Sequence, residues 1–172
     1  PLAGDGAGIL IQMPDAFLRR EFAKQKVKLP KTGDYALGML FLPRAAGTRA
    51  ACEKIIREVV AEEGQTLLGW RDVPTNNARL GKGVQAVEPV VRQVVIGRGD
   101  TTLPESFERK LFVIRKVIEH RVRALAMKDQ GMFYIPSLSS RTLVYKGMLL
   151  ADQVGEYYPD LQDKEMVSAL AL

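Results

Sequence analysis

An unbroken apolar run, residues 35–42 (YALGMLFL), constrains the fold more than any other feature of this sequence. The run carries no charged side chain and ends at Pro43, which cannot donate to a strand ladder. A strand that is apolar on both faces is stable only where other layers cover both of them. We therefore expect this segment at the centre of a layered structure. It is far too short to cross a bilayer.

Two amphipathic helices are predicted to form part of the layers that cover this strand. The first spans 48–63, with Thr48 placed to cap its start and Gly64 to end it. The second follows a capping-box pattern formed by Thr102 and Glu105. Each helix has one apolar stripe at helical spacing. The stripes are Cys52, Ile55, Ile56, Val59 and Val60 in the first helix, and Phe107, Leu111, Ile114, Ile118, Val122 and Leu125 in the second.

The remaining segments give an interleaved order of strands and helices. We predict strands over 9–13, 66–73, 90–96, 132–136 and 143–145, a helix over 16–24 capped by Asp15, and a short helix over 147–154. No internal repeat or linker divides the chain, so one domain is expected. Helices with a single apolar stripe pack on sheet faces, and the predicted fold class is therefore α+β, with helices outside stacked sheets.

Composition excludes several classes of protein. The 172 residues are 47% hydrophobic and 26% charged, as in a soluble globular domain. The single cysteine, Cys52, and the single histidine, His120, cannot build an internal disulfide or a structural zinc site. The net charge of +5 is a mild bias. A basic cluster within 19–31 lacks interleaved exposed aromatic side chains, so neither nucleic acid nor a membrane is expected as a partner.

Three segments carry reactive residue types, and for each we favour a structural interpretation. The glycine-rich loop 4–8 precedes a strand, whereas phosphate-binding loops follow one, so a tight turn is expected. The hydroxyls of 137–142 (SLSSRT) suit bonds to turn backbone, and the only candidate base, His120, is predicted on the polar face of its helix. Cys52, on an apolar helix face, is expected to behave as a small hydrophobe. The residues alone reveal no complete active site.

Both ends of the sequence indicate a part of a longer chain. Residues 1–8 feed directly into a buried strand, and 166–172 (MVSALAL) form an apolar strand-like run without a polar tail. An exposed run of this kind is a pairing hazard at a true terminus.

Five segments, taken jointly, resemble the large subunit of glutamate synthases, in its type 2 (N-terminal nucleophile) glutamine amidotransferase domain. They follow one another in the family's order and extend along the whole chain. They are residues 4–14 (GDGAGILIQMP), 68–74 (LGWRDVP), 88–93 (EPVVRQ), 107–116 (FERKLFVIRK) and 133–148 (FYIPSLSSRTLVYKGM).

The resemblance implies a four-layer αββα sandwich, incomplete in this chain. Residues 1–172 would be part of one amidotransferase domain that lacks its first strand region, with the nucleophile, and its C-terminal part. Such a domain hydrolyses glutamine to glutamate and ammonia. The ammonia then reaches a separate FMN and iron–sulfur domain, which reductively aminates 2-oxoglutarate. The implied partners are the remainder of the large subunit and a small NADPH-oxidising subunit, in the cytoplasm or a plastid.

The resemblance carries no catalytic residue onto this chain. The family's nucleophile is an amino-terminal cysteine whose own α-amine is the base, whereas this sequence opens at Pro1 and stops at Leu172, before the family's oxyanion segment. The fragment alone is therefore expected to be inactive, with no cofactor-binding or metal-binding residue. One loop is predicted to lie beside the nucleophile's pocket, where small residues let the backbone approach closely. Its residues are Asp5, Gly6, Ala7 and Gly8.

Alternatives remain open at this point. The chain could belong to a non-catalytic scaffold or interaction module that retains the amidotransferase fold. The loop 5–8 could be a purely structural turn. Trp70 and Arg71 could lie near a junction with the rest of the enzyme, although a packed indole and a solvated or ion-paired guanidinium are the favoured interpretation.

Overall fold

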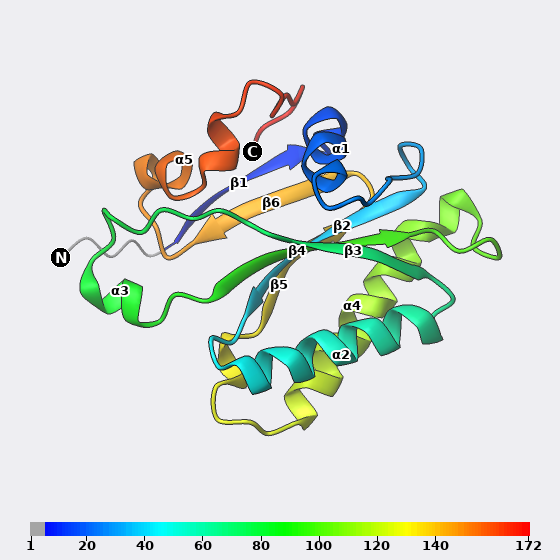
Figure 1. Cartoon of the computed structure of the whole chain (residues 1–172), viewed down its shortest axis with the longest axis horizontal. Coiled ribbons are helices and arrows are strands. Elements are labelled where there is room, and N and C mark those ends of the chain that lie inside the picture. The colour runs from blue at the N-terminus through cyan, green and yellow to red at the C-terminus, as the bar shows by residue number, and fades with distance from the viewer. Residues whose placement is uncertain (1–5) are drawn as a thin grey trace.

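The computed structural model describes residues 6–172 (Figure 1). Its strands are β1 (Ala7–Gln12), β2 (Tyr35–Leu42), β3 (Thr66–Asp72), β4 (Val90–Gly97), β5 (Tyr134–Ser139) and β6 (Thr142–Gly147). Its α-helices are α1 (Asp15–Ala23), α2 (Ala46–Glu62), α3 (Lys82–Ala86), α4 (Phe107–Ala124) and α5 (Val154–Tyr157). Short 3₁₀ helices lie at Pro104–Ser106, Gln130–Met132, Ala151–Gln153 and Pro159–Gln162. Within this part of the chain no helix is long and apolar enough to span a membrane.

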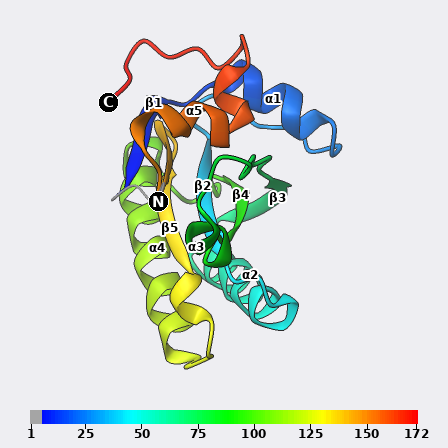
Figure 2. The ribbon, with the colours of Figure 1, turned by 90° about the vertical axis from the view of Figure 1, so that its left-hand side faces the viewer.

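The larger sheet has four antiparallel strands in the order β3-β4-β2-β5. With α2 and α4 between its strands along the chain, it has the βαββαβ order of a split βαβ unit. Both helices pack on one face of this sheet (Figure 2). Their predicted apolar stripes are buried there, at residues 52–60 of α2 and 107–122 of α4. Leu125, expected to continue the second stripe, is exposed because α4 ends at Ala124.

Strand β2 contributes to two separate cores, which confirms the expectation for the apolar run 35–42. Ala36 and Leu40 belong to the core beneath α2 and α4. Leu37 and Met39 belong to a second core on the opposite face of the sheet. All four side chains are at most 2% exposed. Neighbouring side chains of a strand point to opposite faces, so burial of both sets requires a layer on each side.

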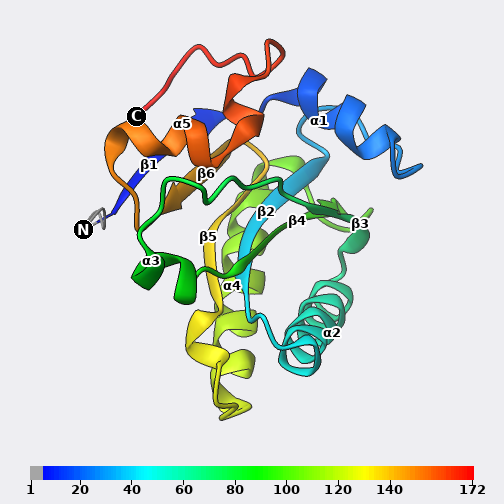
Figure 3. The same ribbon diagram turned by 60° about the vertical axis from the view of Figure 1, so that its left-hand side comes forward.

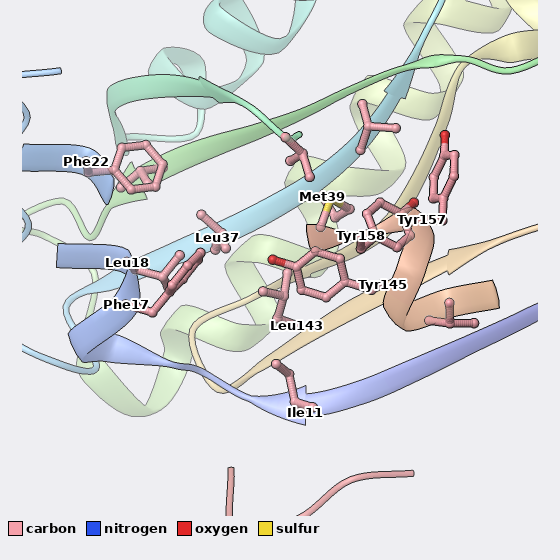
Figure 4. Packing of buried hydrophobic residues seen from close by; sticks show 14 of the residues in the cluster. Ile11, Phe17, Leu18, Phe22, Leu37, Met39, Leu143, Tyr145, Tyr157 and Tyr158 are labelled. Atoms are coloured by element: carbon pink, nitrogen blue, oxygen red, sulfur yellow. The ribbon is translucent and has the colours of Figure 1, made fainter. Parts of the chain in front are cut away.

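The smaller sheet pairs β1 with β6 and covers the second face of β2. Ile11 of β1 and Leu143 of β6 enter the second core together with the apolar side of α1 and the tyrosines of α5 (Figure 4). A helix pair, the four-stranded sheet and the two-stranded sheet are thus stacked, with α1 and α5 beside the smaller sheet (Figure 2). The fold class is mixed α and β with antiparallel sheets, in agreement with the α+β prediction.

The helix starts differ from the sequence prediction because other side chains bond to the polar groups expected to cap them. Thr102 Oγ1 accepts a hydrogen bond from Gln65 Nε2 at 2.8 Å, and no side chain caps α4. Asp15 lies inside the first turn of α1, where its carboxylate accepts from Arg19 Nε and from the Tyr35 hydroxyl, each at 2.7 Å. Helix α2 begins two residues earlier than expected and also has no side-chain cap.

Candidate functional site

The loop predicted to border a pocket lies at the start of β1. Asp5 falls outside the described residues. Gly6 has a φ of +130°, a backbone conformation that only glycine adopts readily. Ala7 pairs with Gly147 at the end of β6, so this loop lies against the end of the smaller sheet. Helix α3 and helix α5 lie at the same end of the molecule (Figure 3).

Gly8 is a position in the smaller sheet that has no room for a side chain. It stands opposite Lys146 in the ladder. A Cβ added at Gly8 would lie 2.6 Å from both the Lys146 Cβ and the Tyr145 carbonyl oxygen. Both neighbours are held by the strand pair, so neither can yield without opening the ladder. The small side chains of this loop therefore allow a close approach between two backbones.

Replacing Gly8 by alanine is expected to lower the free energy of unfolding by about 1–3 kcal/mol, because the added methyl overpacks the β1–β6 pair. Urea denaturation followed by circular dichroism measures the change. Gly47→Ala is the matched control, since a Cβ there meets nothing within 4 Å and lies in the first turn of α2. Helix propensity makes that control neutral or stabilising, by up to about 1 kcal/mol. Equal losses in the two variants would contradict the close approach.

A buried group of polar side chains lies between the two sheets, and we call it the Arg71 cluster (Arg71, Gln93, Tyr145 and Asp160). Arg71 Nη1 and Nη2 donate to the two carboxylate oxygens of Asp160 at 2.8 and 2.7 Å. Nη1 also donates to Gln93 Oε1 at 3.0 Å. The Tyr145 hydroxyl donates to Asp160 Oδ2 at 2.9 Å. The guanidinium lies 5.3 Å from the ring centroid of Phe17, which closes the cluster from the side of α1.

The electrostatics of the Arg71 cluster keep Arg71 charged and Tyr145 neutral. Burial tends to lower the pKa of Arg71, but the hydrogen bonds and charge of Asp160 outweigh burial and raise it. Burial, followed by the charge of Asp160, holds the pKa of Tyr145 well above its ordinary value. The cluster therefore combines an ion pair with a neutral tyrosine, and it ties β3, β4 and β6 to the 3₁₀ helix Pro159–Gln162. Of the two states that the sequence left open for Arg71, solvated or ion-paired, the structure has the ion-paired one.

Trp70 and the basic residues of 19–31 also have structural partners. The indole of Trp70 is half-buried, packs on the core beneath α2 and α4, and lies 5.1 Å from the Arg92 guanidinium carbon. Ion pairs engage much of the basic cluster. They are Arg19–Asp15, Arg20–Asp163, Lys24–Glu21 and Lys31–Asp34.

The hydroxyls of the β5–β6 turn bond to backbone, as the structural interpretation predicted, and also to the Glu108 carboxylate, which it did not predict. Ser137 Oγ accepts from the backbone of β6 at 3.1 Å. Ser139 Oγ accepts from the Thr142 amide at 3.2 Å and donates to Glu108 Oε2 at 3.0 Å. His120 is exposed on α4 and is not among the partners of these serines. Hydrogen bonds to Glu108 therefore hold the turn against α4, and no serine of the turn pairs with His120.

Cys52 is fully buried beneath the larger sheet, and burial raises its pKa to about 11. Thiolate is the reactive form, and it is scarce at such a site near neutral pH. We therefore expect the native protein to resist iodoacetamide near pH 8 and to react promptly in denaturant. Intact mass after timed quenching gives the two rates. Alkylation at the same rate with and without denaturant would show that the thiol is accessible.

All 172 residues match the family model for class-II glutamine amidotransferases. The chain belongs to the class-II glutamine amidotransferases. This membership confirms the family that the five sequence segments indicated.

Relatives of this class-II amidotransferase chain include the glutamate synthase [NADPH] large chains of Bacillus subtilis, at 45% identity over 100% of the chain, and of Azospirillum brasilense, at 36% over 98%. A third is the chloroplastic ferredoxin-dependent glutamate synthase 2 of Arabidopsis thaliana, at 34% over 99% of the chain. The chain spans 11% of the length of the first two relatives and 10% of the third.

The residues of this class-II amidotransferase chain do not suit the iron–sulfur cluster that the resemblance implies for a longer parent protein. Such clusters are held by several cysteine thiolates, whereas Cys52 is the only cysteine of the sequence and is buried. Among the described residues no three histidine, cysteine, aspartate or glutamate side chains gather so that they could hold a metal ion.

Proposed function

We propose that this chain is part of the glutaminase domain of a glutamate synthase. In the parent enzyme glutamine is hydrolysed to glutamate and ammonia. The ammonia is channelled to an FMN and iron–sulfur domain, where 2-oxoglutarate is reductively aminated to glutamate. The observation that carries the proposal is the match of the whole chain to the class-II amidotransferase family, together with its 45% identity to a glutamate synthase large chain.

The proposed domain is a four-layer αββα sandwich of which residues 1–172 form a part, without its first strand region and its C-terminal part. The stacked helix pair and two sheets are compatible with three of these layers. The fourth would be helices on the outer face of the β1–β6 sheet. Leu10 and Val144, which pair on that face, are apolar and only half-buried, and this supports a further layer there.

No residue of this chain is proposed as catalytic. The cysteine nucleophile, its α-amine base and the oxyanion donors would belong to other parts of the domain, and the chain alone would be inactive. Residues 5–8 are proposed to lie beside the nucleophile's pocket. The close backbone approach at Gly8 is consistent with this role, although it serves a structural turn equally well.

The proposed partners follow from the parent enzyme. They are the remainder of the large subunit, glutamine as substrate of the intact domain, and a small NADPH-oxidising subunit. The relatives include glutamate synthases named for NADPH, for NADH and for ferredoxin. The proposed location is the cytoplasm, or a plastid in a plant or alga, as the name of the Arabidopsis relative illustrates.

Ammonia release from glutamine tests the proposal in the full-length parent protein. We expect release by the parent, loss of release when its amino-terminal cysteine is replaced by alanine, and no release by residues 1–172 alone. A parent without an amino-terminal cysteine that releases no ammonia would support the alternative, a scaffold that retains the amidotransferase fold. Binding of the parent to partner proteins would then be the activity to measure.

A further inference from the structure

An apolar cleft of about 200 Å³ opens at the end of the molecule that holds the start of β1. Its walls come from the ends of four strands, from the segment around α3, and from α5. Residues on these walls include Phe41, Val91, Tyr134, Met148 and Tyr157. Gly147, opposite Ala7 in the β1–β6 ladder, lies on the same wall.

The rim of this cleft carries large apolar side chains in contact with solvent. Val87 is 56% exposed, Tyr134 is 42% exposed and Met148 is 56% exposed. Exposed apolar side chains gathered around a concavity mark a surface that binds something. Inside, the rings of Phe41 and Tyr134 lie 6.1 Å apart in a tilted arrangement, and methionine thioethers contact aromatic rings favourably. This lining favours an aromatic ligand over a polar one.

Two charged side chains reach the cleft, and only one of them is available to a ligand. Glu88 Oε1 accepts from the Tyr157 hydroxyl at 2.7 Å and Oε2 accepts from Asn77 Nδ2 at 2.8 Å. The Arg44 guanidinium lies 3.9 Å from the same carboxylate and offsets its charge. Lys146 Nζ lies 4.9 Å from the centroid of the Tyr134 ring, and it forms no ion pair with a carboxylate of the described residues. An anionic group on the ligand would therefore complete the site.

We propose that this cleft binds a small aromatic carboxylate, with the ring against Phe41, Tyr134 and Met148 and the carboxylate on Lys146 Nζ. A charge-assisted hydrogen bond from a lysine to a carboxylate supplies orientation as well as affinity. The rest of the affinity comes from burial of the ring against the aromatic wall of the cleft. The cleft lies near residues 5–8, since its Gly147 pairs with Ala7, but the proposal does not require the glutaminase reaction and is tested without it.

The test uses the 172-residue chain with 3-phenylpropanoate as the probe and 3-phenylpropanamide as its uncharged counterpart. Calorimetry measures each dissociation constant, and amide chemical shifts locate the binding. We expect the carboxylate to bind about tenfold or more tightly than the amide, with shifts at Val87, Gly147 and Met148. Lys146→Met, which keeps the aliphatic stem, should remove that difference. Lys54→Met, an exposed lysine on α2, should leave it unchanged.

Three results would overturn the proposal. The first is no binding at millimolar probe by a chain that circular dichroism shows to be folded. The second is equal affinity for the two probes, or unaltered affinity of the carboxylate for Lys146→Met. The third is binding by the 172-residue chain that is absent in the longer parent protein, which would assign the cleft to another segment of the parent.

Discussion

Replacement of Asp160 by alanine is expected to lower the free energy of unfolding by about 3–5 kcal/mol, the usual cost of removing one partner of a buried ion pair. Asp160 and Arg71 are each 5% exposed. Without the carboxylate, the guanidinium stays buried with Gln93 as its hydrogen-bond acceptor and only the longer ion pair with Glu21, at 3.6 Å, to offset its charge. The Tyr145 hydroxyl also loses its own acceptor. A buried charge that has lost its closest counter-charge is the reason for the large effect.

Two further variants separate this mechanism from a general loss of packing. The double replacement Arg71→Met with Asp160→Leu removes both charges, and it should recover much of the stability lost in Asp160→Ala, since apolar groups of similar size often replace buried pairs at little cost. Glu62→Ala breaks the exposed pair with Arg121 and should have a far smaller effect. Urea denaturation gives all three values. A double variant less stable than Asp160→Ala would show that packing, and not charge, dominates.

Truncation of Ile114 to alanine is the second large expected effect, at about 2–5 kcal/mol. Ile114 is fully buried on the face of α4 that packs against the four-stranded sheet. The loss combines the transfer free energy of the removed methyl and methylene groups with the cavity that they leave. Because the core lies between a helix pair and a sheet, several neighbours would have to move together to fill that cavity.

Phe112 provides the matched control on the same helix. It is 61% exposed, and its ring lies 5.7 Å from Lys116 Nζ on the solvent side. Phe112→Ala removes a larger side chain, yet its effect should stay within about 0.5 kcal/mol, as for most surface substitutions. Thermal unfolding of both variants gives the comparison. A ranking in which Phe112→Ala is the more damaging would indicate that the outer face of α4 is covered in solution.

The central strand and the two long helices could be predicted from sequence because each has a hydrophobic pattern that fits only one kind of secondary structure. The run 35–42 offers no polar face, and each helical stripe has a period that only a helix satisfies. The helix caps could not be predicted, because Thr102 accepts from Gln65 and Asp15 accepts from Tyr35, which are distant in the chain, while Asp15 also pairs with Arg19 on the next turn of α1. Local capping patterns do not reveal such competition. Helix α3, only five residues long, had no apolar period to indicate it.

The candidate site also has some features that the sequence predicted and others that it did not. The close approach at Gly8 was expected from a glycine-rich loop entering a strand, and the hydroxyl bonds of the β5–β6 turn were expected from its composition. The Arg71 cluster was not predicted. The sequence left Arg71 as a solvated or ion-paired guanidinium, and nothing local identifies Asp160, which follows in the chain only after three further strands.

The pairing of β1 with β6 has a consequence for the order in which the chain folds. Gln12 pairs with Thr142, about 130 residues further along, and closing so long a loop is entropically costly. Between them, β2 and β5 are neighbours, with Leu37 opposite Ser139. Once the βαββαβ unit has formed, only the segment before β2 and the β5–β6 turn separate the two strands, which shortens the effective loop to about 25 residues and lowers the closure cost by about 1.5 kcal/mol. We therefore expect the βαββαβ unit to form first and β1, the strand that contains Gly8, to join the structure late.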